Sequence, residues 1–404
     1  MTKSGTSDAS EPSAKSSLIN WEQFRAEMPI CRRWAYFDHA AVAPLPKPAE
    51  SAVVAWSEQA ATLGDTCWPQ WSQRIERLRG RFSQLISATT KEIALIPNTT
   101  TGIHLVAEGF PWRAGDGVVF PEDEFPSNAY PWLNLASRGV VPIAVPRPDS
   151  GWTTDALIDA CDETTRLISV SWIGYASGYR LDLEELIDRA HQRGILVFID
   201  AIQGLGVYPI HVSALKADFL AADGHKWLLG PEGAGMLFIA ERHLDLLRPL
   251  IAGWNSVESA QNFDDLNWKP KQSASRYEGG SQNMVGFAGL DASVELLQSA
   301  GAGPDSQRMA DRIRELASET RELLLSAGAN FDPPRSSNHD SGILPFDIPG
   351  SDPTSFRSRC LDGGVVLSVR GGRLRISPHV YNNREDLERL TEIVRDQVRN
   401  PLSS

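Results

Sequence analysis

Short apolar segments alternate with segments of helical periodicity between about residues 90 and 240, and this alternation restricts the fold more than any other feature. Several apolar segments are nearly continuous hydrophobic runs, as expected for strands that are covered on both faces. The segment 181–193 has the clearest helical periodicity, with its leucines and isoleucine on one face. The pattern predicts an α/β fold with a large, mostly parallel sheet. The predicted strands are 93–96, 117–120, 140–145, 167–172, 195–199, 219–222 and 235–240.

The pattern changes after about residue 300. A long charged helix (305–327) precedes short strands and a last helix at 384–399, which predicts a smaller C-terminal α+β domain. The expected short strands lie near 342–346, 365–368 and 374–376. Residues 1–17 are polar and predict a disordered tail. We therefore expect a large domain over 18–300, whose N-terminal part could pack with the small domain, and a small domain over 301–404.

Composition and charge exclude several classes of protein. The chain has 404 residues with 42% hydrophobic and 22% charged side chains, which is ordinary for a globular protein. The net charge of −12, without a basic stripe, argues against nucleic-acid binding. No apolar run reaches the roughly 18 residues of a membrane span, and no signal peptide is recognisable. Four scattered cysteines without a C-x-x-C pair predict neither disulfides nor a metal site, so a cytoplasmic location is expected.

Two residues of opposite charge follow neighbouring predicted strands. Asp200 ends an apolar strand, and Lys226 lies in a turn just after another strand. Both side chains would emerge at the carboxyl edge of a parallel sheet, where α/β proteins bind ligands. An acid and a lysine there suit pyridoxal phosphate: the lysine forms a Schiff base with the aldehyde, and the acid keeps the pyridine nitrogen protonated. The alternative is an aspartate that caps a turn and a lysine in solvent.

Two further segments fit this cofactor. Thr99, Thr100 and Thr101 begin a predicted helix directly after a strand, and free N–H groups at a helix N-terminus bind phosphate. Threonine is also a common helix cap without any ligand. Phe125 follows the next strand, where its ring could stack on the cofactor or simply belong to the core.

The series Asp200, Gln203, His225-Lys226 and Gly230-Pro-Glu-Gly resembles the class V aminotransferase family of fold-type I pyridoxal-phosphate enzymes. Cysteine desulfurases, selenocysteine lyases and isopenicillin N epimerase-like proteins belong to this family. The resemblance extends from about residue 36 to residue 383. It implies a seven-stranded large domain, a small C-terminal domain, and a homodimer with active sites at the interface.

The resemblance also implies roles for individual residues. Lys226 matches the Schiff-base lysine, Asp200 the partner of the pyridine nitrogen, and Gln203 the residue that binds the phenolic oxygen. The expected cofactor contacts are Thr99, Thr100, Phe125, Asp200, Gln203, His225 and, from the partner subunit, Ser281. Arg375 matches the arginine that holds the substrate carboxylate, a task that suits a planar guanidinium.

The sequence departs from the family pattern in three places. Phe125 stands where many relatives have a stacking histidine, and a phenyl ring cannot exchange protons. Asp223 stands at a usual phosphate-binding serine, so we expect its carboxylate to turn away or a donor to lie between. The segment 171–178 does not align with the family's asparagine-containing turn.

Cysteine placement decides among the reactions that the family performs. A persulfide-forming desulfurase needs a thiolate on a loop before the substrate arginine, but only four residues separate Arg370 from Arg375 and none is cysteine. Cys360 lies in a predicted helix and is expected to be structural. The first hypothesis is therefore an enzyme that acts at the α-carbon of an amino acid, by transamination or epimerisation, with Lys226 as the base. The alternative is a C–S or C–Se lyase.

Other assignments remain weaker. A nicotinamide-dependent oxidoreductase lacks the G-x-G-x-x-G signature, and a Walker A loop is missing. A non-catalytic protein that kept the fold is disfavoured because the chain retains both the lysine and the acid. Candidates for the wall of the substrate pocket are Trp254, Asn255, Tyr130, Arg276 and His39, the last of which could equally face solvent.

Overall fold

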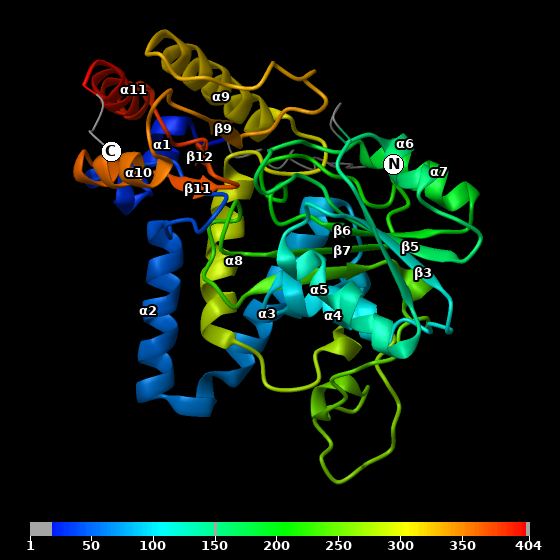
Figure 1. Cartoon of the computed structure of the whole chain (residues 1–404). Helices are drawn as coiled ribbons and strands as arrows, with labels where there is room; N and C mark the ends of the chain where they lie inside the picture. Colours follow the sequence, from blue (N-terminus) through cyan, green and yellow to red (C-terminus); the bar gives the residue numbers. More distant parts are fainter. Residues whose placement is uncertain (1–17, 149–151, 401–404) are drawn as a thin grey trace, which may run out of the picture.

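The structure is a computed structural model that describes residues 18–148 and 152–400. The predicted disordered tail lies outside the described residues. The fold is an α/β fold in which a seven-stranded sheet forms the centre of the larger part of the molecule (Figure 1). In the described ranges, no helix has the length and apolar character needed to cross a lipid bilayer.

The central sheet has the strand order β2-β8-β7-β6-β5-β3-β4. Its strands are β2 (Ile93–Ile96), β3 (Gly117–Pro121), β4 (Val141–Val145), β5 (Thr165–Ser171), β6 (Leu196–Asp200), β7 (Phe219–Asp223) and β8 (Gly235–Ile239). All seven predicted strands are present, and each end lies within two residues of its predicted position. Continuous apolar runs were a reliable signal here because strands in the middle of such a sheet are covered on both faces, so every side chain along them can be apolar. In β3, β7 and β8 every residue is buried.

Strand direction brings several chain segments to one edge of this sheet. Strands β3 to β7 are parallel to one another, whereas β8 is antiparallel to both β7 and β2. Strand β2 therefore runs in the same direction as β7. The carboxyl ends of all strands except β8 consequently lie at the same edge, which is where the residues of the candidate site follow.

Helices cover both faces of the sheet. Side chains of β6 alternate between two cores: Val197 and Ile199 pack on one side, and Phe198 packs on the other. Helices α3, α6, α7 and α8 contribute to the first core, and α4 and α5 contribute to the second. The helices of this part are α2 (Lys47–Thr62), α3 (Trp68–Ile86), α4 (Thr99–Gly109), α5 (Tyr130–Asn134), α6 (Thr154–Asp159), α7 (Leu183–Gln192) and α8 (Met284–Ser299). Helix α1 (Trp21–Ala26) lies beside the C-terminal elements in Figure 1.

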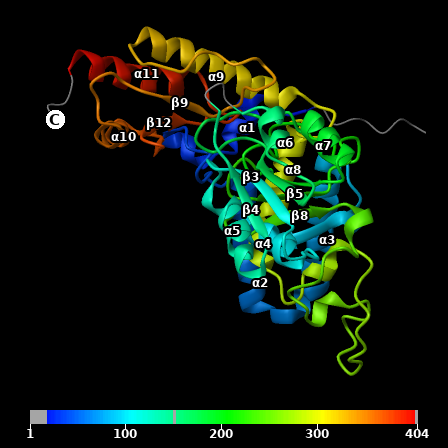
Figure 2. The ribbon, with the colours of Figure 1, turned by 45° about the vertical axis from the view of Figure 1, so that its right-hand side comes forward.

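The C-terminal elements gather at one end of the molecule, above the sheet in Figure 1 and to its upper left in Figure 2. They are α9 (Arg308–Ser326), β9 (Leu344–Phe346), α10 (Pro353–Asp362), β10 (Val365–Val366), β11 (Ser368–Arg370), β12 (Arg373–Ile376) and α11 (Arg384–Arg399). Strands β11, β12 and β9 form an antiparallel sheet. Strand β1 (Ala35–Tyr36), from near the N-terminus, pairs in parallel with β10. Phe37, which follows β1, is buried in a third core to which α9, α10 and α11 contribute. The division at residue 300 stays a prediction.

Helix α4 packs unusually closely against the sheet, and this places its N-terminus at the carboxyl edge. A Cβ atom on Gly102 would lie 2.7 Å from the Cβ of Ala221 in β7, so a larger residue would push the helix away. Asn98 caps the helix by accepting a hydrogen bond from the backbone of Thr101 at 2.8 Å.

Candidate active site

A cavity of about 230 Å³ lies at the carboxyl edge of the sheet. Its wall is formed by residues that follow β2, β3, β5, β6 and β7, together with residues 40–42 and two arginines of the C-terminal unit. Eight of the nine residues that the sequence predicts as site residues line it. They are Thr99, Thr100, Phe125, Asp200, Gln203, His225, Lys226 and Arg375.

Lys226 projects into this cavity from the turn that follows β7. The turn closes with a hydrogen bond from the backbone N–H of Leu229 to the carbonyl of Lys226 at 3.0 Å. Leu229 has a φ of 57°, a left-handed conformation that is uncommon for a branched side chain and that the surrounding core must hold in place. Burial lowers the pKa of the Lys226 ammonium to about 8, so about a tenth of the amine is neutral near pH 7, far more than for an exposed lysine.

Asp200 is the last residue of β6 and is 3% exposed. One of its carboxylate oxygens accepts a hydrogen bond from the backbone N–H of Ile202 at 3.0 Å. Burial raises the pKa of this carboxyl to about 6. A cationic group in the cavity, such as a protonated ring nitrogen, would stabilise the carboxylate.

Gln203 is held in one orientation by two neighbours. Its side-chain Nε2 donates to the carbonyl of Ala40 at 3.0 Å, and its Oε1 accepts from the indole N–H of Trp227 at 2.9 Å. Because the indole can only donate and the carbonyl can only accept, the amide cannot be flipped without losing both hydrogen bonds. The second hydrogen on Nε2 remains available to a group in the cavity.

The N-terminus of α4 supplies polar groups at another part of the wall. The hydroxyl of Thr99 is buried and has no hydrogen-bond partner within the described part of the chain. Thr100 donates to the hydroxyl of Ser127 at 2.8 Å. An unpartnered buried hydroxyl is costly, so a ligand acceptor at this helix end would satisfy both it and the free backbone N–H groups.

Asp223 also lines the cavity, but its oxygens engage its own turn. One oxygen accepts from the backbone N–H of Gly224 at 2.7 Å, and the other lies 3.1 Å from Nδ1 of His225. These contacts are consistent with the expectation that the carboxylate turns away from an anion bound nearby.

Arg375 is 1% exposed and lies on β12 beside the cavity. Its guanidinium donates to the carbonyl of Tyr175 at 2.7 Å, to the hydroxyl of Ser368 at 3.1 Å and to Asp38 at 3.2 Å. Burial lowers the pKa of this arginine, which still leaves it charged at neutral pH.

The turn before Arg375 is a two-glycine hairpin. Gly371 and Gly372 connect β11 to β12, with φ values of 56° and 76° that favour glycine at both positions. No loop is present there that could carry a thiol. None of the four cysteines, all of which lie in the described ranges, lines the cavity, and Cys360 is fully buried in the core of the C-terminal unit.

Several proposed wall residues lie elsewhere. Ser281 is exposed and outside the cavity of its own chain, and its predicted contact with the partner's cofactor stays a prediction. Tyr130 is 66% exposed on α5, and Arg276 is buried in an ion pair with Asp245. The remaining candidates also do not line the cavity of this chain; these are Trp254, Asn255 and His39. The alternative of a solvent-facing His39 is wrong as well, because His39 is fully buried.

Other site residues were not predicted from the sequence. Arg370, Ser127, Ser171 and Tyr175 line the cavity, and Ser171 and Tyr175 also line a neighbouring cavity of about 330 Å³. The Tyr175 ring lies edge-on to Phe125, with 5.3 Å between the ring centres. The position of Ser171 at the end of β5 was a usable signal. The described residues contain no group of three or more His, Cys, Asp or Glu side chains arranged to hold a metal ion.

Comparisons with known proteins identify the family of this chain. The family model for class-V aminotransferases matches residues 35–390, most of the described chain. The chain belongs to the class-V aminotransferase family. A probable cysteine desulfurase of Methanothermobacter thermautotrophicus is 31% identical over 403 residues, which cover 94% of this chain and 98% of that protein. The family is pyridoxal-phosphate-dependent, and this protein is therefore a pyridoxal-phosphate-dependent enzyme.

Solved structures show the same fold. The apo structure of a cysteine desulfurase from Thermococcus onnurineus NA1 is 25% identical and has a TM-score of 0.82, covering 94% of this chain and 98% of its own. C-DES, described as a cystine C–S lyase in complex with its product cysteine persulfide, is 21% identical with a TM-score of 0.83. That comparison covers 91% of this chain and 99% of the other. The architecture is thus that of fold-type I pyridoxal-phosphate enzymes, as the sequence predicts.

Proposed function

We propose that the protein is a C–S lyase that eliminates a sulfur substituent from the β-carbon of an amino acid. The observation that carries this proposal is a cavity with a neutralisable lysine and a buried carboxylate but no thiol, in a chain whose relatives are named cysteine desulfurases. The relatives favour this alternative over the transamination or epimerisation that the sequence pattern put first.

The cavity residues fit pyridoxal phosphate. Lys226 supplies the amine for its aldehyde, Asp200 an anion for its ring nitrogen, and Gln203 an N–H for its ring oxygen. The unpartnered hydroxyl of Thr99, with Thr100 and His225, offers donors to its phosphate. Phe125 would stack on the ring, and Ser281 of the partner subunit would complete the phosphate site in a homodimer.

Lys226 would act as the base. When bound, pyridoxal phosphate draws electrons from the bonds of the substrate α-carbon into its protonated ring. Lys226 would take the α-proton, and the lowered pKa of its amine provides the neutral form at physiological pH. The electron pair left on the α-carbon forms the Cα–Cβ double bond as the C–S bond breaks, and the sulfur leaves with its electron pair.

The substrate would be anchored by its carboxylate. Arg375 has a planar guanidinium in the cavity wall, and its contact with the carbonyl of Tyr175 holds it in place. The neighbouring 330 Å³ cavity shares Ser171 and Tyr175 with the cofactor cavity, so it would receive the group beyond the β-carbon.

A persulfide-forming desulfurase is disfavoured because no cysteine lies in the cavity or on the hairpin turn before Arg375. Transamination or epimerisation remains the second candidate, because these reactions use the same lysine and also need no thiol. A cytoplasmic location and a homodimer belong to the proposal.

Analysis of the reaction products distinguishes the C–S lyase from transamination and epimerisation. Purified holoenzyme would be incubated with L-cysteine, L-cystine and common amino acids, and with Lys226→Ala as the inactive reference. Pyruvate, ammonia and a reduced or persulfidic sulfur product from a sulfur amino acid would support the lyase. A keto acid with the amino form of the cofactor, or the opposite enantiomer of the substrate, would contradict it and establish the second candidate.

A further inference from the structure

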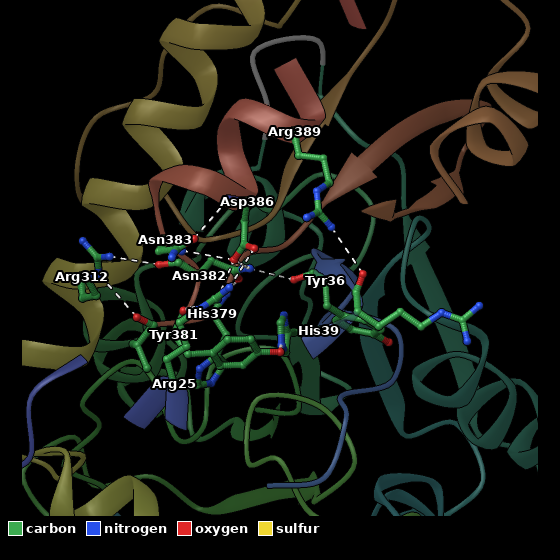
Figure 3. Close-up of polar contacts among 12 residues, drawn as sticks. Arg25, Tyr36, His39, Arg312, His379, Tyr381, Asn382, Asn383, Asp386 and Arg389 are labelled. Carbon is green, nitrogen blue, oxygen red and sulfur yellow. Dashed lines mark hydrogen bonds and ion pairs between the residues drawn. The ribbon is translucent and has the colours of Figure 1, made fainter. Parts of the chain in front are cut away.

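Four ring side chains form a buried group behind the cofactor cavity, where the C-terminal unit meets the rest of the chain. We call His39, Trp227, His379 and Tyr381 the junction cluster. Each is at most 1% exposed, and their contacting rings lie 5.1–6.2 Å apart between centres. Figure 3 shows His39, His379 and Tyr381 side by side among the polar contacts of this region.

Hydrogen bonds fix the proton positions at His39. Its Nδ1 lies 2.8 Å from the carbonyl of Ser377, which can only accept, so Nδ1 carries the hydrogen. Its Nε2 therefore accepts from the hydroxyl of Tyr381 at 2.6 Å. Burial lowers the pKa of His39 and raises the pKa of Tyr381, so both side chains stay neutral in this arrangement.

The cluster holds the residue that follows Lys226. Nε2 of His379 lies 3.3 Å from the carbonyl of Trp227, and the Trp227 ring packs against both His39 and His379. The indole N–H of Trp227 is the donor to Gln203. The Trp227 side chain thus connects the C-terminal unit to the cofactor cavity.

A second connection passes through the backbone next to His39. The N–H of Ala40 donates to the hydroxyl of Ser377 at 2.9 Å, and the carbonyl of Ala40 accepts from Gln203 at 3.0 Å. Both hydrogen-bond partners of the Gln203 amide are therefore held by residues of the junction.

We propose that the junction cluster consists of positioning residues that present an N–H of Gln203, rather than its oxygen, to the ring oxygen of pyridoxal phosphate. This rests on the cofactor placement in the proposed function. An amide is free to rotate by half a turn, and a Gln203 oxygen facing the phenolic oxygen would repel it. Trp227 and Ala40 prevent that rotation, so docking of the C-terminal unit determines how tightly the ring oxygen is held.

The test compares two ligands that differ only at the ring oxygen. Dissociation constants for pyridoxal phosphate and for its 3-deoxy analogue would be measured by absorbance titration of the cofactor-free dimer. Trp227→Phe keeps an aromatic ring but removes the indole N–H. We expect this variant to weaken the binding of pyridoxal phosphate about fivefold and to change the affinity for the analogue by no more than a factor of about two.

Tyr381→Phe acts one contact further away. It leaves Nε2 of His39 without a donor. We expect a smaller loss of affinity for pyridoxal phosphate than in Trp227→Phe, again with little change in the affinity for the analogue. Trp112→Phe is the matched control, since its indole donates to the carbonyl of Ala107 at 2.7 Å, away from the cavity. It should change neither dissociation constant.

If Trp227→Phe loses affinity for both ligands equally, the proposal is overturned, because a merely structural role does not distinguish the two ligands. The proposal is also overturned if Trp227→Phe loses no affinity for either ligand. Gln203→Glu, which leaves the cluster intact, provides a test even if the cluster variants do not fold. In its ionised form this glutamate side chain can only accept hydrogen bonds, so the variant should weaken the binding of pyridoxal phosphate but not that of the analogue. If the wild-type protein binds both ligands with equal affinity, the ring-oxygen contact is absent and this proposal is overturned, but the proposed function is not. If the wild-type protein binds neither ligand, the proposed function itself is contradicted.

Discussion

The side-chain nitrogen of Lys226 lies 5.5 Å from the centre of the Phe125 ring. The lysine and the ring come from turns after two different strands, β7 and β3, and face the same cavity. A planar cofactor joined to the lysine would lie against this ring. We expect this contact to be one of stacking without proton transfer, because a phenyl ring cannot exchange protons.

Phe125→Ala should weaken pyridoxal phosphate binding about three- to tenfold, because it removes an aromatic stacking contact. Absorbance titration of the cofactor-free protein measures this directly. Phe331→Ala is the control, since Phe331 stacks on Phe346 in the C-terminal unit with ring centres 5.6 Å apart. An unchanged dissociation constant in Phe125→Ala would show that the ring does not contact the cofactor.

Asp200→Asn should stabilise the cofactor-free protein at pH 7 while weakening cofactor binding. The pKa of Asp200 is raised to about 6 by burial, so the folded state holds this proton more tightly than the unfolded state does. The free energy of unfolding of the wild type therefore falls as pH rises from about 4 to about 6. Removal of the charge should recover roughly 1–3 kcal/mol at pH 7.

Denaturant unfolding of both proteins at pH 4 and pH 7, without cofactor, checks the Asp200 prediction. The increase in the free energy of unfolding from Asp200→Asn should be present at pH 7 and small at pH 4. Added pyridoxal phosphate should stabilise the wild type more than the variant. A variant that is less stable than the wild type at pH 7 would mean that Asp200 supports the fold rather than the cofactor.

Arg375→Lys should lower kcat/KM about 10- to 100-fold, mainly through KM, because an ammonium cannot make the paired N–H contacts of a guanidinium with the substrate carboxylate. Steady-state kinetics with the best substrate from the product screen measures this. Arg138→Lys, in the exposed ion pair with Glu108, is the control. An unchanged KM in Arg375→Lys would assign the carboxylate to another group.

Asp218, just before β7, accepts hydrogen bonds from Arg242 at 2.6 Å, His191 at 2.8 Å, and Val197 and His243 at 2.9 Å. Burial alone would raise the pKa of Asp218, but these hydrogen bonds outweigh it and hold the pKa well below its ordinary value. The stability that Asp218 contributes is thus present above about pH 4 and is lost as pH falls through its folded pKa.

Asp218→Asn should accordingly cost roughly 2–4 kcal/mol of unfolding free energy at pH 7, and the difference should shrink in acid. Asp155→Asn, whose carboxylate is 72% exposed and pairs with Arg189, should change stability little. A loss in Asp218→Asn that is the same at pH 3 and pH 7 would contradict the ionic origin of the effect.

The central sheet could be predicted because its strands are buried on both faces and therefore appear as apolar runs bounded by turn residues. Asp200 and Lys226 could be placed for the same reason, since each follows such a strand directly. The strand ends were displaced by one or two residues because backbone pairing, which defines them, leaves no mark in composition.

The junction cluster could not be predicted. His39 and Tyr381 are 342 positions apart in the sequence, and their hydrogen bond depends on how the C-terminal unit docks. Local pattern assigns a polar histidine to a site wall or to solvent. Here one acceptor, the carbonyl of Ser377, and one donor, the hydroxyl of Tyr381, make full burial possible.

The neighbouring cavity of about 330 Å³ also could not be predicted from the sequence. Its wall combines the segment that carries Tyr175 with Gly371 of the C-terminal hairpin, and neither segment has a periodicity that reveals the other. The assignment of Ser281 depends in the same way on a surface that only a second subunit would provide.

The most direct test of the account is reduction of the holoenzyme with borohydride, followed by proteolysis and mass spectrometry. Reduction makes the bond between the cofactor and its lysine permanent. We predict one modified peptide, with reduced pyridoxal phosphate on Lys226, and no modified peptide in Lys226→Ala. A modification on a different lysine, or unmodified Lys226 in protein that has taken up the cofactor, would contradict it.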